Sequence, residues 1–125
     1  MVVRGFAQVH GINYLDTYAP VTRLETIRFL FALAVEKDWE IRQINVNTTY
    51  LNGVLEEDIF MEAPEGYDVR EGHILKLKKA LYGLKQAGRQ WYKQLHDTIA
   101  KFGLKPLAND LHTYVGHKVI KGIKW

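Results

Sequence analysis

The chain of 125 residues contains no cysteine. Without cysteine there is no disulfide scaffold, no thiolate zinc site, no iron–sulfur cluster and no cysteine nucleophile. Proline and glycine are also scarce, at 3 and 10 residues, and no internal repeat, low-complexity tract or Gly/Ser linker interrupts the sequence. The composition is therefore that of one ordinary folded domain rather than a disordered or fibrous chain.

Long apolar runs are missing as well. The longest, from Phe29 to Val35, is far shorter than the ~20 residues that a membrane-spanning helix needs. The first residues lack a basic stretch followed by an apolar one, which a secretory signal would show. We therefore expect no membrane partner and an intracellular location, cytoplasmic or nuclear.

Several catalytic motifs are absent too. The closest histidine pair, His112 and His117, does not have the spacing of a helical metal motif, and no G-x-G-x-x-G, P-loop or G-x-S-x-G occurs. The acidic run Glu56–Asp58 fits a solvated turn better than a cation site. Read from the residues alone, the sequence predicts no metal site.

Charge is unevenly distributed along the chain. Residues 1–62 hold 5 Lys/Arg and 9 Asp/Glu, a net −4, whereas residues 63–125 hold 12 and 5, a net +7, which together give +3. Clustered basic residues gain affinity for nucleic acid by displacing phosphate counterions, although the same lysines could simply solvate a surface. The second half is therefore a candidate for binding a polyanion.

The first half predicts two strands and one helix. A short strand is expected near residues 2–9, followed by an irregular loop. Thr22 and Glu25 have the spacing of a capping box, and the apolar positions that follow predict a buried helix over residues 23–37. Residues 39–46 have strand composition, but the parity of the apolar positions shifts between Ile41 and Ile44, as at a bulge or in a strand buried on both faces.

The second half predicts a hairpin, a helix and two more strands. Residues 58–62 and 73–78 are expected to pair as a hairpin with a long connection. A helix is expected over residues 87–102, with Gly103 as its stop, and strands over 111–115 and 119–125. This order predicts an α+β fold, with a mostly antiparallel sheet and two main helices packed on one face.

Three stretches carry a family resemblance: YAPVTRLETIR at residues 18–28, QINVNTTYLNG at 43–53 and LKKALYGLKQAGRQWY at 77–92. In this order and spacing they closely resemble the reverse transcriptase of copia-type LTR retrotransposons, an RNA-directed DNA polymerase. The likeness extends over nearly the whole chain. It implies a single partial domain over residues 1–125, with residues 1–38 on the fingers side and 39–125 on the palm side, ending before the Tyr-x-Asp-Asp hairpin.

The resemblance also implies chemistry for which this chain lacks the ligands. Active members bind a template–primer and two Mg²⁺ ions through three carboxylates, and Asn45 stands where the family has the first Asp. The Asp pair of the hairpin is not present in the sequence. We therefore expect no catalytic residue, metal or cofactor in this chain. The alternative is a co-opted non-catalytic module that binds nucleic acid or protein, or that self-associates through an unfinished sheet edge.

The family pattern nevertheless assigns three residues to the nucleotide. Tyr50 falls at the position of a steric gate under the sugar, or else is a core aromatic. Gln86 matches a glutamine that lines the nucleotide pocket, and Arg4 lies in the strand that carries basic residues near the triphosphate. Five further basic side chains are expected on the nucleic-acid side or on a soluble surface: Lys76, Lys78, Lys79, Lys85 and Arg89.

Overall fold

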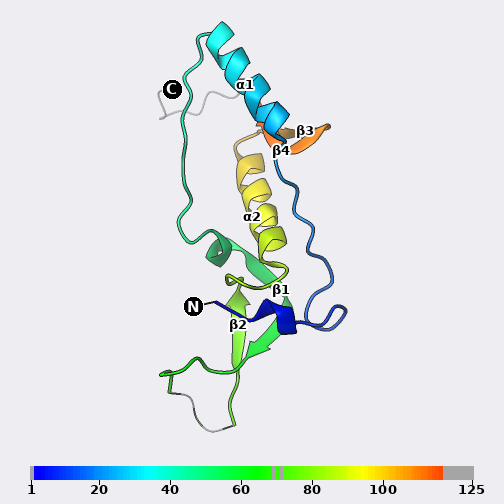
Figure 1. The fold of residues 1–125 in the computed structure, drawn as a ribbon, viewed down its shortest axis with the longest axis vertical. Helices are drawn as coiled ribbons and strands as arrows, with labels where there is room; N and C mark the ends of the chain where they lie inside the picture. The colour runs from blue at the N-terminus through cyan, green and yellow to red at the C-terminus, as the bar shows by residue number, and fades with distance from the viewer. Residues whose placement is uncertain (1, 69, 71, 117–125) are drawn as a thin grey trace. The chain divides into compact units, whose positions relative to one another are not determined.

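The computed structural model describes residues 2–68, 70 and 72–116. The chain forms two compact units, each made of two separate stretches. Unit 1 combines Met1–Ala19 with Thr48–Gln94, and unit 2 combines Pro20–Asn47 with Leu95–Trp125. Figure 1 shows the elements in chain order, which are η1 (Gly5–Ala7), α1 (Leu24–Glu36), η2 (Thr49–Asn52), β1 (Val54–Met61), β2 (Leu75–Lys79), α2 (Ala87–Lys101), β3 (Lys105–Leu107) and β4 (Asp110–Val115).

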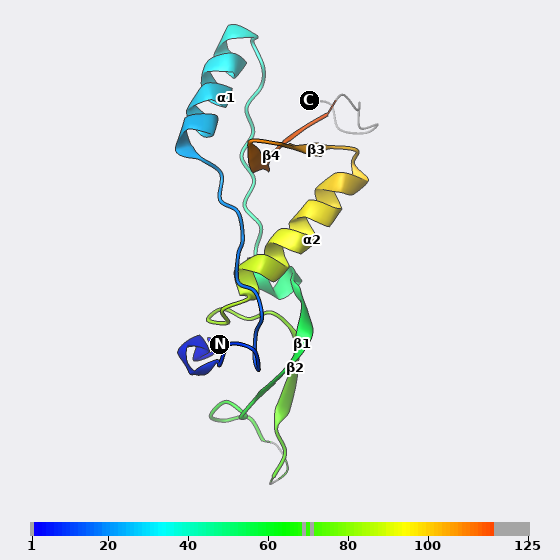
Figure 2. The same cartoon turned by 90° about the vertical axis from the view of Figure 1, so that its right-hand side faces the viewer.

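The predicted hairpin with a long connection is confirmed in unit 1. Strands β1 and β2 pair antiparallel and lie side by side in both Figure 1 and Figure 2. The pairs Ile59↔Leu77 and Met61↔Leu75 set the register at one end, and the register shifts between Val54 and Ile59. Such a shift is a bulge, which bends the strand that contains the extra residues.

The buried centre of unit 1 is small. It consists of Ile59 from β1 and of Ala80, Leu84 and Ala87 from the stretch that leads into α2. Ile59 faces inward because side chains alternate along a strand, and its neighbours Asp58 and Phe60 are exposed. Five partly buried residues pack around this centre: Val3, Tyr50, Leu55, Leu77 and Leu81.

The expected strand over residues 2–9 is wrong. The segment instead forms the 3₁₀ turn η1 and an isolated bridge between His10 and Tyr14. It is held to unit 1 by a backbone hydrogen bond of 2.8 Å from the Val3 amide to the Tyr82 carbonyl. A strand needs a ladder of such bonds, and this segment turns away after the first one.

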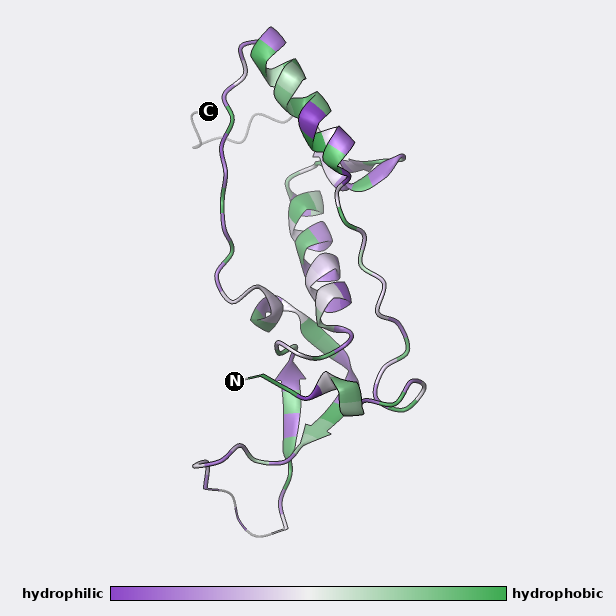
Figure 3. Cartoon of the chain, in the orientation of Figure 1, coloured by the Kyte–Doolittle hydropathy of each residue, from purple (hydrophilic) through white to green (hydrophobic). Residues whose placement is uncertain are grey.

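The predicted first helix is confirmed as α1, but the capping box and the burial are wrong. The N-cap residue is Arg23, and no side chain of the cap itself bonds to the helix end. Ala34 is the one fully buried residue of α1, whereas Phe29 and Val35 are 64% and 80% exposed. Figure 3 shows apolar residues along most of this helix. An apolar pattern predicts a helix, but the pattern alone does not bury it.

The predicted strand over residues 39–46 is also wrong. Helix α1 ends with Asp38 in the left-handed region at φ 53°, and the Trp39 amide donates to the Ala34 carbonyl at 2.8 Å. These are the features of a Schellman motif, in which glycine usually takes the left-handed place. Residues 39–46 then continue as exposed chain with no helix or strand. Residues with high strand propensity do not form a strand unless a neighbouring strand pairs with them.

The predicted second helix is confirmed as α2, and Gly103 follows it at φ 79° as expected. The strand expected over 111–115 is confirmed as β4, which pairs antiparallel with β3. The sequence did not indicate β3 because Pro106 lies at its centre. The strand expected over 119–125 lies outside the described residues.

The predicted α+β class is therefore confirmed, with a correction to the sheet. In place of one larger sheet, residues 2–116, except 69 and 71, form two separate two-stranded antiparallel sheets, β1–β2 and β3–β4. The fingers and palm assignment stays a prediction. In the part of the chain that the structure describes, no helix is long and apolar enough to cross a membrane.

Candidate functional site

Unit 1 holds eight of the residues that the sequence singles out for binding, which are Arg4, Tyr50, Lys76, Lys78, Lys79, Lys85, Gln86 and Arg89. They come from the N-terminal segment, η2, β2 and the start of α2. Asn45 belongs to unit 2, where it lies exposed in the chain that follows α1. The eight binding candidates thus belong to one unit, and Asn45 belongs to the other.

Gln86 is the most buried of these candidates, with no exposed surface. Its amide nitrogen donates to the carbonyl of Asn13 at 2.9 Å, and its amide oxygen accepts from Gln8 at 2.9 Å. Gln8 in turn accepts from the backbone amide of Lys85 at 2.8 Å. In this arrangement the Gln86 amide holds residues 8–13 against the turn before α2. Its nucleotide-lining role stays a prediction.

Tyr50 lies in η2 and is half-buried against the core of unit 1. Its ring packs against the ring of Tyr82 at a centroid distance of 4.6 Å and an interplanar angle of 58°. Thr48, just before η2, adopts the left-handed region at φ 50°, which a β-branched residue rarely does. The steric-gate role and the core role both remain open for Tyr50.

Three of the predicted basic residues already have partners. Lys76 pairs with Asp58 at 2.6 Å, and Arg89 pairs with Asp16 at 3.1 Å. The ammonium group of Lys85 donates to the Tyr14 hydroxyl at 3.3 Å. Each of these contacts competes with a phosphate for the same charge.

The other three predicted basic residues are exposed and have no ion pair among the residues described. They are Lys78 and Lys79 on β2 and Arg4 beside η1. No acidic residue occurs between Leu75 and Lys93, so the local charge on β2 and the following turn is positive. The charge of these three side chains is therefore available to a polyanion.

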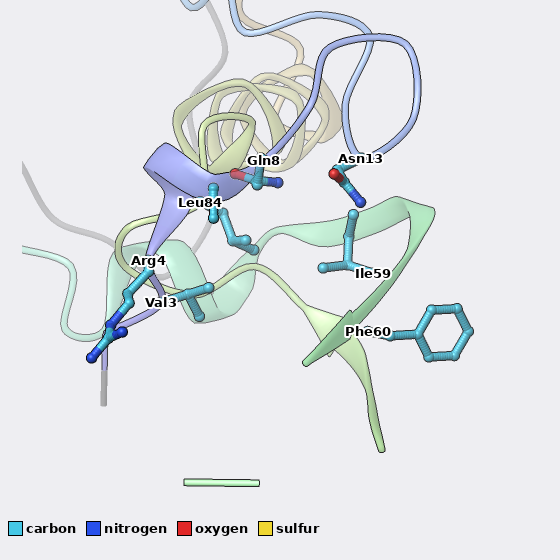
Figure 4. Close-up of a pocket in the computed structure, with 8 residues that line it drawn as sticks. Val3, Arg4, Gln8, Asn13, Ile59, Phe60 and Leu84 are labelled. Carbon is cyan, nitrogen blue, oxygen red and sulfur yellow. The ribbon is translucent and has the colours of Figure 1, made fainter. Parts of the chain in front are cut away.

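A pocket of about 150 Å³ lies in unit 1, and Arg4 contributes to its lining. Figure 4 shows the Phe60 ring directed away from Ile59 and Leu84, so the apolar floor comes from the latter two side chains. The polar side chains of its lining are those of Arg4, Gln8 and Asn13, all from the N-terminal segment. The lining residues are Val3, Arg4, Ala7, Gln8, Asn13, Ile59, Phe60 and Leu84.

Several polar contacts of unit 1 have no signal in the sequence. Gln8, Asn13 and Asp16 lie in the stretch expected to be a strand and a loop, and their partners are more than seventy residues away in sequence. Glu56 accepts from Lys93 at 2.7 Å, and this hydrogen bond is the main cause that lowers the pKa of the Glu56 carboxyl. The predicted solvated turn is therefore wrong: the acidic run lies in strand β1, and Glu56 and Asp58 are both ion-paired.

The residues present do not fit a catalytic metal. Asn45 offers one neutral oxygen, which brings no negative charge to a divalent ion. Across residues 2–68, 70 and 72–116, no three His, Asp or Glu side chains gather in a group that could hold a metal ion.

Comparison with known proteins identifies the class. A family model described as reverse transcriptase (RNA-dependent DNA polymerase) matches residues 1–123. The chain is 38% identical over 117 residues to the retrovirus-related Pol polyprotein from transposon RE1 of Arabidopsis thaliana, which covers 92% of this chain and 8% of that protein. It belongs to the reverse transcriptase family, and its relatives place it among the copia-type members.

Two further relatives extend the comparison. The Pol polyprotein from transposon TNT 1-94 of Nicotiana tabacum is 47% identical over 94 residues, covering 74% of this chain and 7% of that protein. The transposon Ty1-H Gag-Pol polyprotein of Saccharomyces cerevisiae is 28% identical over 95 residues, covering 72% and 5%. The chain thus spans less than a tenth of the length of these relatives. No solved structure matches it.

Proposed function

We propose that this reverse transcriptase segment contacts nucleic acid without performing nucleotidyl transfer itself. The observation that carries the proposal is Asn45 at the position of the family's metal-binding Asp. An amide cannot supply the negative charge that a carboxylate gives to a divalent ion, and metal-ion stabilisation of the transition state amounts to several kcal/mol. Losing that carboxylate is expected to abolish measurable turnover.

Support for the binding half of the proposal comes from the charge of unit 1. Lys78, Lys79 and Arg4 are exposed and have no acidic partner among the described residues, whereas Lys76, Lys85 and Arg89 are already engaged. A phosphate that contacted any one of the first three charges would not break an existing ion pair among the described residues. Binding of this kind is weak, independent of base sequence and strongly dependent on salt.

The binding experiment measures fluorescence anisotropy of a labelled RNA–DNA hybrid with the chain at several salt concentrations. Replacing Lys78 and Lys79 by Ala is expected to weaken binding and to reduce the slope of log affinity against log salt by about one per lost phosphate contact. The matched control replaces Lys101 and Lys105, two exposed lysines of unit 2. Equal losses in both variants would contradict a specific role for β2.

The catalytic experiment measures primer extension on an RNA template with Mg²⁺ or Mn²⁺. The chain is expected to show no template-dependent incorporation. A positive result with the native chain would overturn the proposal. Binding and turnover are read out separately, so failure of one half leaves the other half standing.

A second candidate function, a protein-interaction module, is favoured by the apolar side chains that α1 and residues 39–46 expose. Exposed apolar side chains that gather on a surface often mark a site of interaction with another protein.

A further inference from the structure

The pocket of unit 1 has an unused hydrogen-bond donor on its wall, the side-chain nitrogen of Asn13. The other polar groups of this residue are engaged. Its backbone amide donates to the Val9 carbonyl at 2.9 Å, its side-chain oxygen accepts from the Val9 amide at 2.9 Å, and its carbonyl accepts from Gln86 at 2.9 Å. Among the described residues, the side-chain nitrogen has no such partner. It is therefore available to a molecule in the pocket.

The orientation of the Asn13 side chain is fixed by its neighbour Val9. A backbone N–H needs an acceptor, so the amide oxygen faces Val9 and the amide nitrogen lies on the other side. Figure 4 shows the nitrogen end of this side chain directed toward Ile59, on the floor of the pocket. The N–H groups of Asn13 thus donate into the pocket, and reversing the amide would break the contact with Val9.

The floor and the wall of the pocket are held in place by contacts within unit 1. Ile59 and Leu84, which form the floor, are 4% and 5% exposed and belong to the buried centre. Gln8 is engaged at both ends of its amide, with the Gln86 side chain at 2.9 Å and the Lys85 backbone at 2.8 Å. A pocket that is already formed in this way needs little reorganisation to receive a ligand.

The size and the lining of the pocket define the chemistry of its occupant. A cavity of about 150 Å³ is large enough for one benzene ring, so a single six-membered ring fits and two fused rings do not. None of the described residues that line the pocket is acidic. The charged one is Arg4, whose exposed side chain leads away from the floor in Figure 4. The matching occupant is a flat single ring that carries a hydrogen-bond acceptor and has negative charge beside it.

A pyrimidine base of a nucleic-acid strand meets each of these conditions. Every pyrimidine base is a single six-membered ring with a carbonyl oxygen, whereas adenine has two fused rings and no carbonyl. The phosphates on either side of the nucleotide supply the negative charge. A base in a duplex is paired and stacked, so only an unpaired base can enter a pocket.

We propose that this pocket binds one unpaired pyrimidine base, whose carbonyl oxygen accepts a hydrogen bond from the side-chain nitrogen of Asn13. The proposal rests on the proposed function, in which unit 1 contacts nucleic acid, and it adds a preference for single strands and for pyrimidines. Tyr50 and Gln86 do not line the pocket, so this site differs from the residues that the family pattern assigns to the nucleotide, apart from Arg4.

The experiment measures fluorescence anisotropy of labelled oligo(dT), oligo(dC), oligo(dA) and an abasic strand of the same length with the full chain. The abasic strand keeps the phosphates and lacks the bases, so its affinity measures the phosphate contacts alone. Oligo(dT) and oligo(dC) are expected to bind about tenfold more tightly than the abasic strand, and oligo(dA) close to it. Equal affinities for pyrimidine and abasic strands would overturn the inference and leave the proposed function standing. Absence of binding to every strand would remove both.

Asn13→Asp tests the hydrogen-bond donor. The carboxylate keeps the acceptor for the Val9 amide and replaces the N–H groups by an oxygen. Because its charge also repels phosphates, the quantity compared is the ratio of the oligo(dT) affinity to the abasic affinity, in which that repulsion cancels. This ratio is expected to fall close to unity. A ratio equal to that of the native chain would overturn the role of Asn13.

Ala7→Leu tests the pocket by filling it. Ala7 lines the pocket and is exposed, so a larger side chain takes the place of the ligand without entering the buried centre. The pyrimidine preference is expected to be lost while the affinity for the abasic strand stays the same. The matched control is Ala100→Leu, at an exposed position of unit 2, which is expected to leave both affinities unchanged. A preference that survives in Ala7→Leu, or that is lost equally in both variants, would contradict this pocket as the site.

Discussion

The backbones of Gly5 and Gly83 pass so close to each other that a methyl group on Gly5 would overlap the carbonyl oxygen of Gly83. Gly83 itself lies at φ 99°, a conformation that side-chain-bearing residues rarely adopt, and a methyl group there would overlap the Val3 carbonyl. This crossing sets the N-terminal segment against the turn that leads into Gln86. The two glycines, 78 positions apart in sequence, thus allow the N-terminal segment to pack against the turn before α2.

Gly5→Ala is expected to destabilise the chain by about 1–3 kcal/mol or more, because backbone must move to admit the methyl group. Urea denaturation followed by circular dichroism measures the change. The matched control is Gly88→Ala in α2, where the nearest atom to the new methyl group is the Ala19 Cβ at 3.8 Å. That substitution is expected to stabilise by about 0.5–1 kcal/mol, as glycine is a poor helix former. If both substitutions changed the unfolding free energy in the same direction, the close approach of Gly5 and Gly83 would not explain the effect of Gly5→Ala.

Replacing Gln86 by Met keeps the side chain's volume but leaves the Gln8 amide nitrogen and the Asn13 carbonyl without their partner. Unsatisfied buried polar groups cost about 1–3 kcal/mol each, so we expect a loss of that order in unfolding free energy. The control is a double-mutant cycle with Gln8→Met. If the two losses were simply additive, the Gln8–Gln86 hydrogen bond would not be a coupled interaction.

The sequence predicted the elements whose signals are local. The stripe of Trp91, Leu95 and Ile99, followed by Gly103, specifies α2 from local sequence alone. The two strand-like runs of the β1–β2 hairpin follow each other directly in the chain, so each has its partner in the next run. Residues 2–9 and 39–46 were expected as strands and are not. A strand depends on a partner, which a single stretch of sequence cannot name.

The residues of the candidate site also fall into two groups, those with a signal in the local sequence and those without one. Family motifs selected Tyr50, Gln86 and the lysines of β2, and the structure gathers them in unit 1. The residues that the sequence missed, Gln8 and Asn13, act through contacts more than seventy positions along the chain. No periodicity or motif connects such pairs, so only the folded structure brings them together.

Asp38 lies two residues beyond the end of α1 at φ 53°, where glycine would meet no steric penalty. Asp38→Gly is therefore expected to stabilise the helix end, by up to about 1 kcal/mol, while Asp38→Ala is expected to destabilise it. Thermal unfolding of both variants, followed by far-ultraviolet circular dichroism, measures the two shifts. Opposite signs are the diagnostic result, since loss of the aspartate charge is common to both substitutions.

Asp110 links β4 to the start of α1 within unit 2. Its carboxylate accepts from the Arg23 amide at 3.3 Å and from the His112 amide at 3.0 Å. The pKa of the Asp110 carboxyl is lowered, chiefly by a hydrogen bond from the Thr26 side chain and further by these two amides. Position 110 thus supplies the helix-end contact that the expected capping box of Thr22 and Glu25 does not.

Because the pKa of Asp110 is lower in the folded state, its contribution to the free energy of unfolding decreases as the pH falls. The contribution of Asp110 is fully present above its unfolded-state pKa, near 3.8, and is lost as the pH falls through its lower folded-state value. Asp110→Asn is therefore expected to be less stable than the native chain at neutral pH and to converge toward it in acid. Urea denaturation from about pH 6 to about pH 2 measures the convergence.

Two variants separate this effect from other carboxyls. Glu56 also has a lowered pKa, chiefly because of Lys93, so the comparison is made in a Glu56→Gln background. Thr26→Val removes the largest cause of the shift, and the pKa of Asp110 is then expected to rise toward its ordinary value in a carboxyl-detected NMR titration. An unchanged pKa in Thr26→Val would show that the backbone amides of His112 and Arg23 and the Thr113 side chain hold the charge, and the link to α1 would rest on Arg23.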